Sequence, residues 1–379
     1  MRESLIAPPG LKNVIVADTE LGDVQGEAGF YHFRQYSAIE LAAKRTFEEV
    51  WYLMFDGRLP DPAELTAFRA EIAAHRPVPP ELRDMLPVIA AAGADRGMLA
   101  GLRTALSLLG ARFPASWGAD RATLRANAIT IAAATPAILA ALHRIRTGRE
   151  VIEPRADLST AANWLWMLTG DEPAPEHEAA INRYLICTID HGFNASTFTA
   201  RVVASAGADV ASAICGAIGT FTGPLHGGAP DRALDALDEI GSPDRVREWV
   251  RAKIAAGDRI MGFGHPVYRT EDPRARMLRE IGTALGGPLI DFAVRVENEV
   301  VRALAELKPG RELYTNVEFY AGVVMEQCGI PRSMFTPTFA VSRVVGWTAQ
   351  VLEQATGTKI FRPLARYVGP PAPEPVPAG

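Results

Sequence analysis

Two histidines, His226 and His265, stand in the glycine-rich segments GPLHGGAP and IMGFGHPVYRTEDPR. A glycine lies directly beside each imidazole, at Gly227 and Gly264. Glycine permits unusual backbone dihedrals and close approach of a ligand, and imidazole is well suited to proton transfer near neutral pH. Both histidines are therefore candidate catalytic residues, although each could instead be a buried histidine bonded to a loop carbonyl. No HxxxH or HxxE spacing accompanies them, so a metal site is not expected.

Three arginines near these segments and the C-terminus, Arg274, Arg343 and Arg362, are candidate anion ligands. A planar guanidinium binds a carboxylate through two parallel hydrogen bonds. Three guanidinium groups around one site would suit a dicarboxylate. The chain has 39 lysines and arginines in all, so solvation of the surface is the alternative role for any one of them.

Glu318 is the candidate base, because it stands between two apolar residues, Val317 and Phe319. A carboxylate in apolar surroundings is expected to have a raised pKa, which suits removal of a proton from a weak carbon acid. The alternative is a carboxylate in the first turn of a helix, beside Asn316.

The elements that must position these residues are mostly helical. Capping-box patterns at Ser37 and Thr46 predict the starts of two short helices. Residues 11–36, with the apolar run 14–16, predict one or two small β-hairpins. Apolar periodicity predicts a helix over 197–221 that is buried on all sides. It also predicts helices over residues 62–74, 81–110, 120–135, 137–147, 176–189, 230–239, 243–256, 273–285, 291–307, 317–327 and 337–356.

Length and composition narrow the class of protein. A chain of 379 residues is expected to form one large or two unequal domains. Its net charge of −5 without a basic block predicts no nucleic-acid partner. Cys187, Cys215 and Cys328 stand far apart, which suits free thiols in a reducing cytoplasm.

Two stretches bear on targeting. Residues 1–10 lack a long apolar run, so no signal peptide is expected. The apolar stretch 128–142 is shorter than the roughly 18–20 residues of a membrane span and contains Pro136. The stretch predicts a buried helix or helix pair, so the protein is not expected to bind or span a membrane.

No alternating βαβ pattern, GxGxxG segment or Walker loop appears, which argues against a nucleotide-binding α/β fold.

Several sequence segments, taken in their order along the chain, resemble those of a known protein family. DHGFNASTFTAR, GPLHGGAP, MGFGHPVYRTEDPRAR, NVEFYAGVV, SRVVGWTAQVLEQ and a final RP follow one another at separations that resemble the citrate synthase family. The early stretch GFYHFRQYSAIELAAKRTFEEVWYLMFDGRLP is also similar to that family. The resemblance covers roughly residues 10–368, nearly the whole chain.

The resemblance implies an all-α, citrate synthase-like fold of two domains, with a short β segment near the N-terminus. The large domain would comprise residues 1–227 and 323–368, and the small domain residues 228–322. The Pro-rich residues 369–379 are expected to be a disordered tail. The resemblance also implies a homodimer with an active cleft between the domains, and we expect the cleft to close on the substrate.

The resemblance implies roles for individual residues in the condensation of acetyl-CoA with oxaloacetate. His226 would bond the thioester oxygen, His265 would polarise the ketone, and Glu318 would remove the methyl proton. Groups expected to hold oxaloacetate are His191, Arg274 and Arg343, with Arg362 supplied by the partner subunit. Groups expected to contact coenzyme A are Arg269, Gly262 and Gly264. Coenzyme A enters as a thioester substrate, with no permanently bound cofactor and no metal.

Three positions depart from the family pattern. Glu318 stands where the base is normally aspartate, Gly192 where many relatives have glutamate, and Pro266 where many bacterial relatives have arginine. An extra methylene moves a carboxylate by about 1–1.5 Å, and a shift near 1 Å can cost about a hundredfold in rate. Two alternatives to citrate synthesis stay open. One is 2-methylcitrate synthesis from propionyl-CoA by the same residues; the other, motivated by glutamate in place of aspartate, is a catalytically weak paralogue that senses CoA or dicarboxylates.

Overall fold

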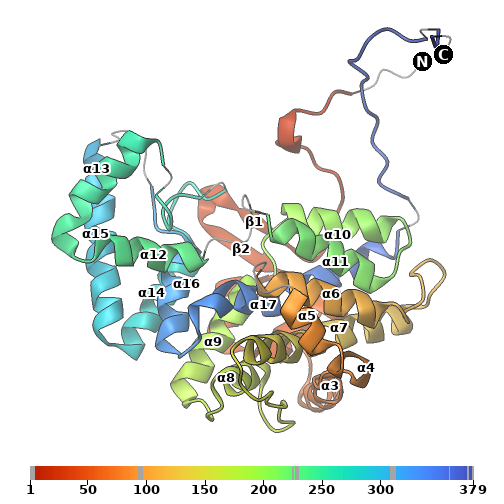
Figure 1. Cartoon of the computed structure of the whole chain (residues 1–379), viewed down its shortest axis with the longest axis horizontal. Helices are drawn as coiled ribbons and strands as arrows, with labels where there is room; N and C mark the ends of the chain where they lie inside the picture. Colours follow the sequence, from red (N-terminus) through yellow and green to blue (C-terminus); the bar gives the residue numbers. More distant parts are fainter. Residues whose placement is uncertain are drawn as a thin grey trace.

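The structure is a computed structural model that describes residues 5–92, 97–223, 226, 230–258, 260–265, 267–307, 313–357, 359–373 and 375–377. Gly227 and Pro266, which the sequence singled out, lie outside these ranges. The described chain is mostly helical, with one small sheet, as the sequence predicts (Figure 1). Its helices up to residue 221 are α1 (Ala38–Lys44), α2 (Phe47–Asp56), α3 (Pro62–His75), α4 (Pro80–Arg83), α5 (Leu86–Ala92), α6 (Met98–Gly110), α7 (Arg121–Arg146), α8 (Thr160–Thr169), α9 (Pro175–Thr188), α10 (Ala195–Ser205) and α11 (Val210–Phe221).

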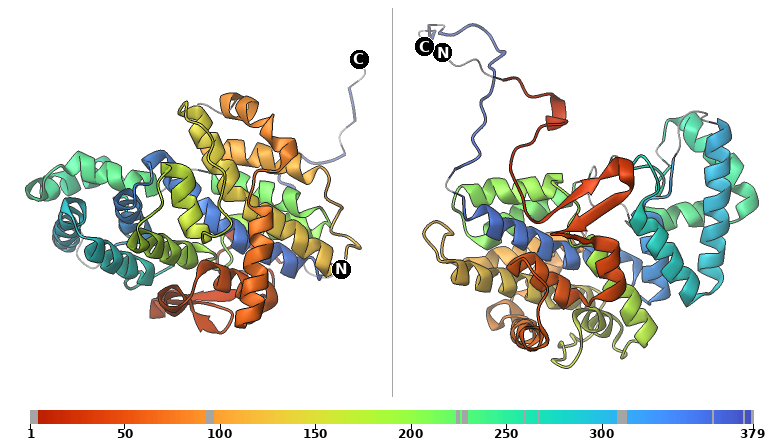
Figure 2. Two further views of the ribbon diagram at one scale, coloured as in Figure 1. Left: turned by 90° about the horizontal axis from the view of Figure 1, so that it is seen from below. Right: turned by 180° about the vertical axis from the view of Figure 1, so that it is seen from behind.

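The helices beyond residue 229 are α12 (Pro230–Ile240), α13 (Val246–Ala256), α14 (Pro273–Leu285), α15 (Pro288–Leu307), α16 (Val317–Gln327) and α17 (Phe335–Gln354). Short 3-10 turns are η1 (Pro9–Leu11), η2 (Gly26–Ala28), η3 (Pro243–Arg245) and η4 (Arg332–Met334). Helices α12 to α16 pack mainly on one another and form a group to one side of the remaining helices (Figure 2). This grouping supports a small domain over residues 228–322, a division that we keep as a proposal.

The sheet is a three-stranded antiparallel meander of β1 (Gly22–Gln25), β2 (Phe30–Phe33) and β3 (Tyr36–Ser37). Gly22 pairs with Phe33 and His32 with Ser37. The predicted hairpins are thus confirmed, but the apolar run 14–16 forms no strand. Ile15 in that run is exposed, and Asn13 before it has a φ of 60°. An apolar triplet without a neighbouring strand has no ladder to join, so the expectation of β structure there was wrong.

Side-chain caps start the first helices where the sequence predicts them. Ser37 accepts a hydrogen bond from the Glu40 N–H at the start of α1. At α2, Thr46 and Glu49 form a complete capping box. Because such caps satisfy N–H groups that have no partner inside the helix, they fix the first residue of each element.

The expected break at Pro136 does not occur, because α7 runs without interruption through it. Proline removes one backbone hydrogen bond and costs about 3 kcal/mol or more in a helix interior. Burial outweighs this cost, since the residues from Ala128 to Leu142 are almost wholly buried. Among the described helices of at least 18 residues, α7 is long and apolar enough to cross a membrane, yet 83% of its most apolar window is buried in the protein.

The single helix expected over residues 197–221 is two helices, α10 and α11. Gly207 has a φ of 78°, and the Asp209 side chain accepts from the Ser212 N–H to start α11. The two helices pack on each other, but Ser212 is exposed and Val202 is partly exposed. The prediction of burial on all sides was therefore also wrong, because one face of the pair reaches the surface. The cap at Asp209 explains the break between the two helices.

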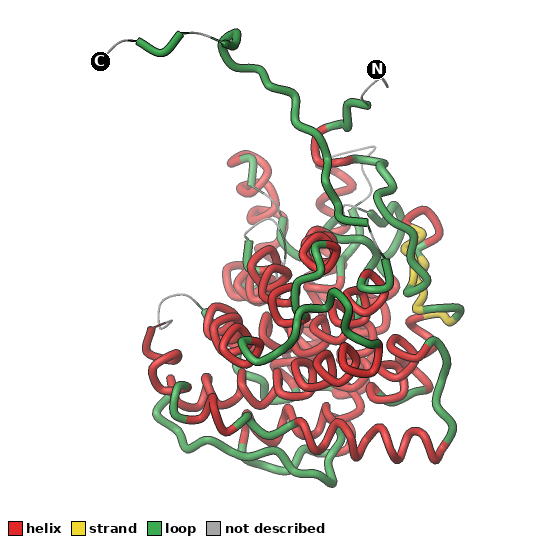
Figure 3. Tube along the Cα trace, turned by 90° about the vertical axis from the view of Figure 1, so that its right-hand side faces the viewer, coloured by secondary structure: helices red, strands yellow, loops and turns green. Residues whose placement is uncertain are grey.

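Helix α17 is buried along nearly its whole length and contacts α2, α7, α9, α10, α11 and α12. It carries Arg343 into the interior. Both ends of the chain leave the body on the same side as extended arms (Figures 1 and 3). The arm after α17 exposes Ile360, Leu364, Tyr367 and Val368, so these apolar side chains are not buried in the described chain.

Candidate active site

The segment that carries His265 is fastened to the start of α16 by backbone hydrogen bonds. Gly264 N donates to Tyr314 O at 2.7 Å, and Asn316 N donates to Gly262 O at 2.9 Å. Both glycines have a φ of 84°, a conformation that other residues rarely adopt. A side chain at position 262 would also lie 2.9 Å from the Phe319 ring. The backbone conformation therefore favours glycine at both positions, whereas contact of these glycines with coenzyme A stays a prediction.

The hydrogen bonds of His265 determine which ring nitrogen carries its proton. Its Nδ1 accepts from the N–H groups of Val267 and Tyr268, at 3.0 and 3.1 Å. In a neutral imidazole the proton then lies on Nε2. Burial first and Arg274 second lower the pKa of His265 to about 4, which keeps it neutral near pH 7. His265 is thus a neutral hydrogen-bond donor through Nε2.

Arg274 lies beside that donor. Its Nη2 is 3.3 Å from His265 Nε2, and both nitrogens carry protons. Two donors facing one another leave room for an acceptor to bind both, such as a ketone or carboxylate oxygen. The geometry therefore defines a position for a substrate oxygen between Arg274 and His265.

Asp272 holds Arg274 in place and connects it to α16. It binds the guanidinium through both oxygens, at 3.0 and 2.8 Å, and accepts from Val317 N at 3.1 Å. Burial acts to raise the pKa of Asp272, but Arg274 lowers it below its ordinary value. Burial alone would lower the pKa of Arg274, yet the pair with Asp272 raises it. The same carboxylate thus fixes the Arg274 guanidinium and the first residue of α16, next to Glu318.

Arg343 is the second buried cation of the site. Its Nε donates to Thr188 O at 2.9 Å, and its guanidinium carbon lies 4.7 Å from the Phe339 ring centre. Burial lowers the pKa of Arg343 to about 10, while Asp190 opposes this shift. In the described part of the chain, no carboxylate forms a salt bridge with Arg343, so its remaining N–H groups are available to an anion.

His191 completes this group. Its ring centre is 5.5 Å from that of His265, and its Nε2 is 2.9 Å from the Tyr268 hydroxyl. Burial, followed by the fields of Arg274 and other nearby groups, lowers the pKa of His191 well below its ordinary value. Two neutral imidazoles and two guanidinium groups therefore surround one region.

His226 lies on a separate hydrogen-bonded chain. Its Nε2 is 2.8 Å from Ser196 Oγ, which is 2.7 Å from Asn194 Oδ1 and accepts from Trp347 Nε1 at 3.1 Å. The single hydroxyl proton of Ser196 can go to Asn194 or to His226. If it goes to His226, the proton of the neutral imidazole lies on Nδ1. Burial, with Arg343 second, lowers the pKa of His226 to about 4.

Glu318 is the second residue of α16, and Asn316 caps the helix by accepting from Glu318 N at 3.1 Å. The first-turn position weighed from the sequence is confirmed. Val317 and Phe319 on either side are buried, in keeping with the apolar surroundings that the sequence predicts. The helix N-terminus favours a charged carboxylate, whereas apolar neighbours disfavour it. The role of Glu318 as a base therefore stays a prediction.

Two predicted ligands, Arg362 and Arg269, are exposed. Arg362 is exposed on the C-terminal arm, where the preceding Phe361 N–H donates to Ser205 Oγ at 3.1 Å. Arg269 is exposed, and its N–H donates to Gly26 O at 3.1 Å. Within the described ranges, no contact joins Arg362 to a histidine. Among the described residues, no group of three or more His, Cys, Asp or Glu could hold a metal ion.

Sequence reasoning missed several residues that shape the site. Asp272 could have been found, because an aspartate before Pro273 is a strong helix N-cap signal. Ser196 follows Asn194, the N-cap of α10, and that motif also offered a signal. Tyr268 offered none, since its contact with His191 depends on tertiary folding.

Comparisons with known proteins find relatives over nearly the whole chain. The family described as "Citrate synthase, C-terminal domain" matches residues 10–364. Citrate synthase from Synechocystis sp. is 37% identical, covering 97% of this chain and 92% of that protein. A 2-methylcitrate synthase from Mycobacterium tuberculosis is 38% identical, covering 95% and 90%. A solved citrate synthase from Thermoplasma acidophilum, in complex with carboxymethyl coenzyme A and oxaloacetate, has a TM-score of 0.89 at 29% identity and covers 97% of both chains.

The fold and these relatives define an enzyme that transfers an acyl group. The chain belongs to the citrate synthase family. The family and the two-domain, all-helical fold class inferred from the ordered motifs are thereby confirmed.

Proposed function

We propose that this enzyme condenses acetyl-CoA with oxaloacetate and hydrolyses the resulting citryl-CoA to citrate and CoA. The main support is the convergence of His265 Nε2 and Arg274 on one acceptor position. Arg343 is buried, and its charge acts on His191, whose ring centre lies 5.5 Å from that of His265. This set of donors fits a 2-oxo dicarboxylate, with the arginines on its carboxylates and His265 on its ketone oxygen.

The first chemical step is formation of the enol of the thioester. In our proposal Glu318 takes a proton from the methyl carbon, while His226 donates a hydrogen bond to the thioester oxygen. For His226 to donate from Nδ1, the Ser196 hydroxyl must turn from Asn194 Oδ1 toward His226 Nε2. A neutral donor aimed at the developing negative charge lowers the barrier for a weak carbon acid.

Condensation and hydrolysis follow. The enol carbon attacks the ketone carbon, so the new C–C bond forms while the thioester carbonyl re-forms. His265 and Arg274 stabilise the charge on the ketone oxygen, which becomes a hydroxyl by taking up one proton and so balances the proton that Glu318 removed from the methyl group. Water then cleaves the thioester bond, which releases citrate and the CoA thiol. Arg269, Gly262 and Gly264 are proposed to contact coenzyme A, which enters as a substrate.

The proposed assembly is a homodimer in the cytoplasm. Arg362 would reach the active site of the partner subunit, which accords with its place on an exposed arm whose apolar side chains are not buried in the described chain. Three free cysteines suit a reducing compartment.

A second candidate reaction is the formation of 2-methylcitrate from propionyl-CoA by the same residues. The observation that favours it is the 38% identity to a 2-methylcitrate synthase over 95% of this chain. A third interpretation, a dicarboxylate or CoA sensor, is motivated by glutamate in the position of the usual aspartate. The retained histidines and arginines argue against a sensor, because a binding protein needs no catalytic donors.

A thiol-release assay with acetyl-CoA and oxaloacetate tests the proposal. Glu318→Ala should lower kcat by at least about a hundredfold, the scale of general-base catalysis. Glu318→Asp withdraws the carboxylate by about 1–1.5 Å and should lower kcat by tenfold to about a hundredfold. Glu299→Ala, which removes an exposed carboxylate of α15, is the matched control and should leave kcat unchanged. Wild type no faster than Glu318→Ala would instead support the sensor.

A further inference from the structure

Tyr268 touches both imidazoles that face the proposed dicarboxylate site. It is 4% exposed, its N–H donates to His265 Nδ1, and its hydroxyl lies 2.9 Å from His191 Nε2. Its ring centre is 4.7 Å from that of His265. Tyr268 therefore connects the loop before α14 to the segment after α9.

The direction of the hydrogen bond between Tyr268 and His191 follows from counting protons. Among the described residues, His191 Nε2 is the one acceptor within reach of the Tyr268 hydroxyl. If Nε2 carried the histidine proton, the buried hydroxyl would have no acceptor, a condition that costs about 1–3 kcal/mol. Burial acts most strongly to raise the pKa of Tyr268, so the hydroxyl keeps its proton near neutral pH. Tyr268 is then the donor and His191 Nε2 the acceptor.

This assignment determines the other nitrogen of His191. A neutral imidazole with an unprotonated Nε2 carries its proton on Nδ1. Within the described residues, His191 Nδ1 has no hydrogen-bond partner. The ring therefore offers one N–H donor to a bound oxygen, and it lies beside Arg274, whose guanidinium carbon is 5.7 Å from the Tyr268 ring centre.

We propose that Tyr268 is a positioning residue that fixes the orientation and tautomer of His191, so that His191 donates from Nδ1 to the dicarboxylate. The identity of that ligand rests on the proposed function, whereas the tautomer does not. A wrong tautomer would place a lone pair against a carboxylate oxygen and would weaken binding. Tyr268 acts through His191 and takes no part in proton transfer to the thioester.

Nitrogen NMR of the whole enzyme labelled with ¹⁵N-histidine tests the tautomer directly. We expect the His191 signals, assigned by their loss in His191→Gln, to report a protonated Nδ1 and an unprotonated Nε2. In Tyr268→Phe we expect a mixture of tautomers. A protonated Nε2 in wild type would overturn the proposal, and that result does not depend on how the variant folds or on any activity.

Steady-state kinetics with oxaloacetate and acetyl-CoA give the second test. Tyr268→Phe should raise KM for oxaloacetate by about twofold to tenfold, the size expected for one lost hydrogen bond, and should change kcat by less than about twofold. Tyr31→Phe is the matched control, because the Tyr31 ring also faces His191 but its hydroxyl donates to Cys187 O. An unchanged KM in Tyr268→Phe, or an equal rise in Tyr31→Phe, would contradict the assignment. If the wild-type enzyme formed no citrate, the proposed function would be contradicted, but the tautomer of His191 measured by NMR would be unaffected.

Discussion

The histidines of the site are neutral because of where they lie. His226 and His265 each have a pKa of about 4, lowered chiefly by burial and then by a nearby arginine. A neutral imidazole donates a hydrogen bond without giving up a full proton, which suits two successive carbonyl oxygens. The sequence singled out both residues from their glycine neighbours. It could not identify Tyr268, which is 77 positions away from its partner His191.

Burial of neutral histidines makes folding stability depend on pH. In the unfolded chain His226 and His265 take up protons near their ordinary value of 6.5, whereas in the folded protein they do so near 4. Between these values the unfolded state binds more protons, so the free energy of unfolding should fall as pH is lowered. Urea unfolding at about pH 7, 6 and 5 measures this fall. The double variant His226→Gln/His265→Gln should show a shallower one, and an unchanged pH dependence would contradict the assignment.

At the scale of elements, local signals predicted helix starts better than helix interiors. The capping box at Thr46 and Glu49 is present as predicted. The continuity of α7 through Pro136 was not predictable, because burial from distant segments decides it. The break between α10 and α11 was predictable in principle, since an aspartate N-cap at Asp209 marks it.

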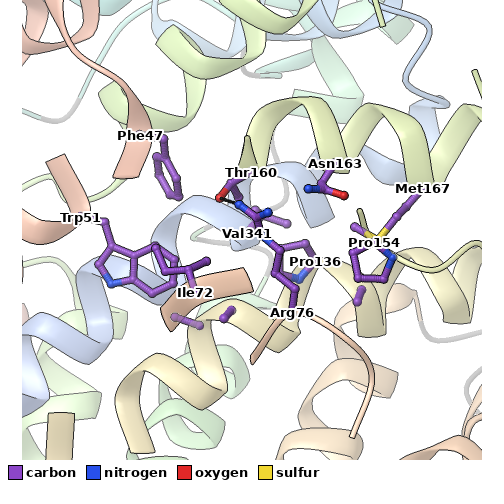
Figure 4. Close-up of a pocket in the computed structure, with 13 residues that line it drawn as sticks. Phe47, Trp51, Ile72, Arg76, Pro136, Pro154, Thr160, Asn163, Met167 and Val341 are labelled. Atoms are coloured by element: carbon purple, nitrogen blue, oxygen red, sulfur yellow. Dashed lines mark hydrogen bonds between the residues drawn. The ribbon is translucent and has the colours of Figure 1, made fainter. Parts of the chain in front are cut away.

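The buried pair of Glu48 and Arg76 ties α2 and α3 to the start of α8. Glu48 is fully buried, accepts from both the N–H and the hydroxyl of Thr160 at 2.7 Å, and lies 3.6 Å from Arg76. Figure 4 shows Arg76 and Thr160 joined by a hydrogen bond at a pocket whose lining residues include no histidine. Removing one partner strands the other in the interior.

Glu48→Ala should therefore lower the free energy of unfolding by about 3–5 kcal/mol, measured by urea denaturation. Glu40→Ala, which removes an exposed partner of Lys44 on α1, is the control and should change stability little. Equal effects of the two substitutions would show that the buried pair makes no special contribution.

At the scale of the whole molecule, the candidate site residues come from two groups of helices. His191 and Arg343 belong to α9, α17 and their surroundings, while His265, Arg274 and Glu318 belong to the segment from residue 260 to α16. Because ligand contacts would span both groups, we predict closure on binding oxaloacetate with a CoA analogue. Small-angle scattering should report a smaller radius of gyration in the complex. Identical scattering curves with and without ligands would count against closure.

The proposed role of Arg362 predicts complementation between subunits. Arg362→Ala and Glu318→Ala should each be nearly inactive alone. After unfolding and refolding together in equal amounts, half of the dimers would be mixed, and each would hold one intact site. Activity should then recover to roughly a quarter of wild type in a two-fold symmetric dimer. No recovery, with mixed dimers shown to form, would mean that Arg362 serves its own subunit.

The central claim is that the acyl substrate is acetyl-CoA and the acceptor is oxaloacetate. The most direct test compares kcat/KM for acetyl-CoA and propionyl-CoA at saturating oxaloacetate, with the products identified as citrate or 2-methylcitrate. We predict that acetyl-CoA is the better substrate. Propionyl-CoA favoured by about tenfold or more, which corresponds to roughly 1.4 kcal/mol in transition-state stabilisation, would contradict the account and favour 2-methylcitrate synthesis.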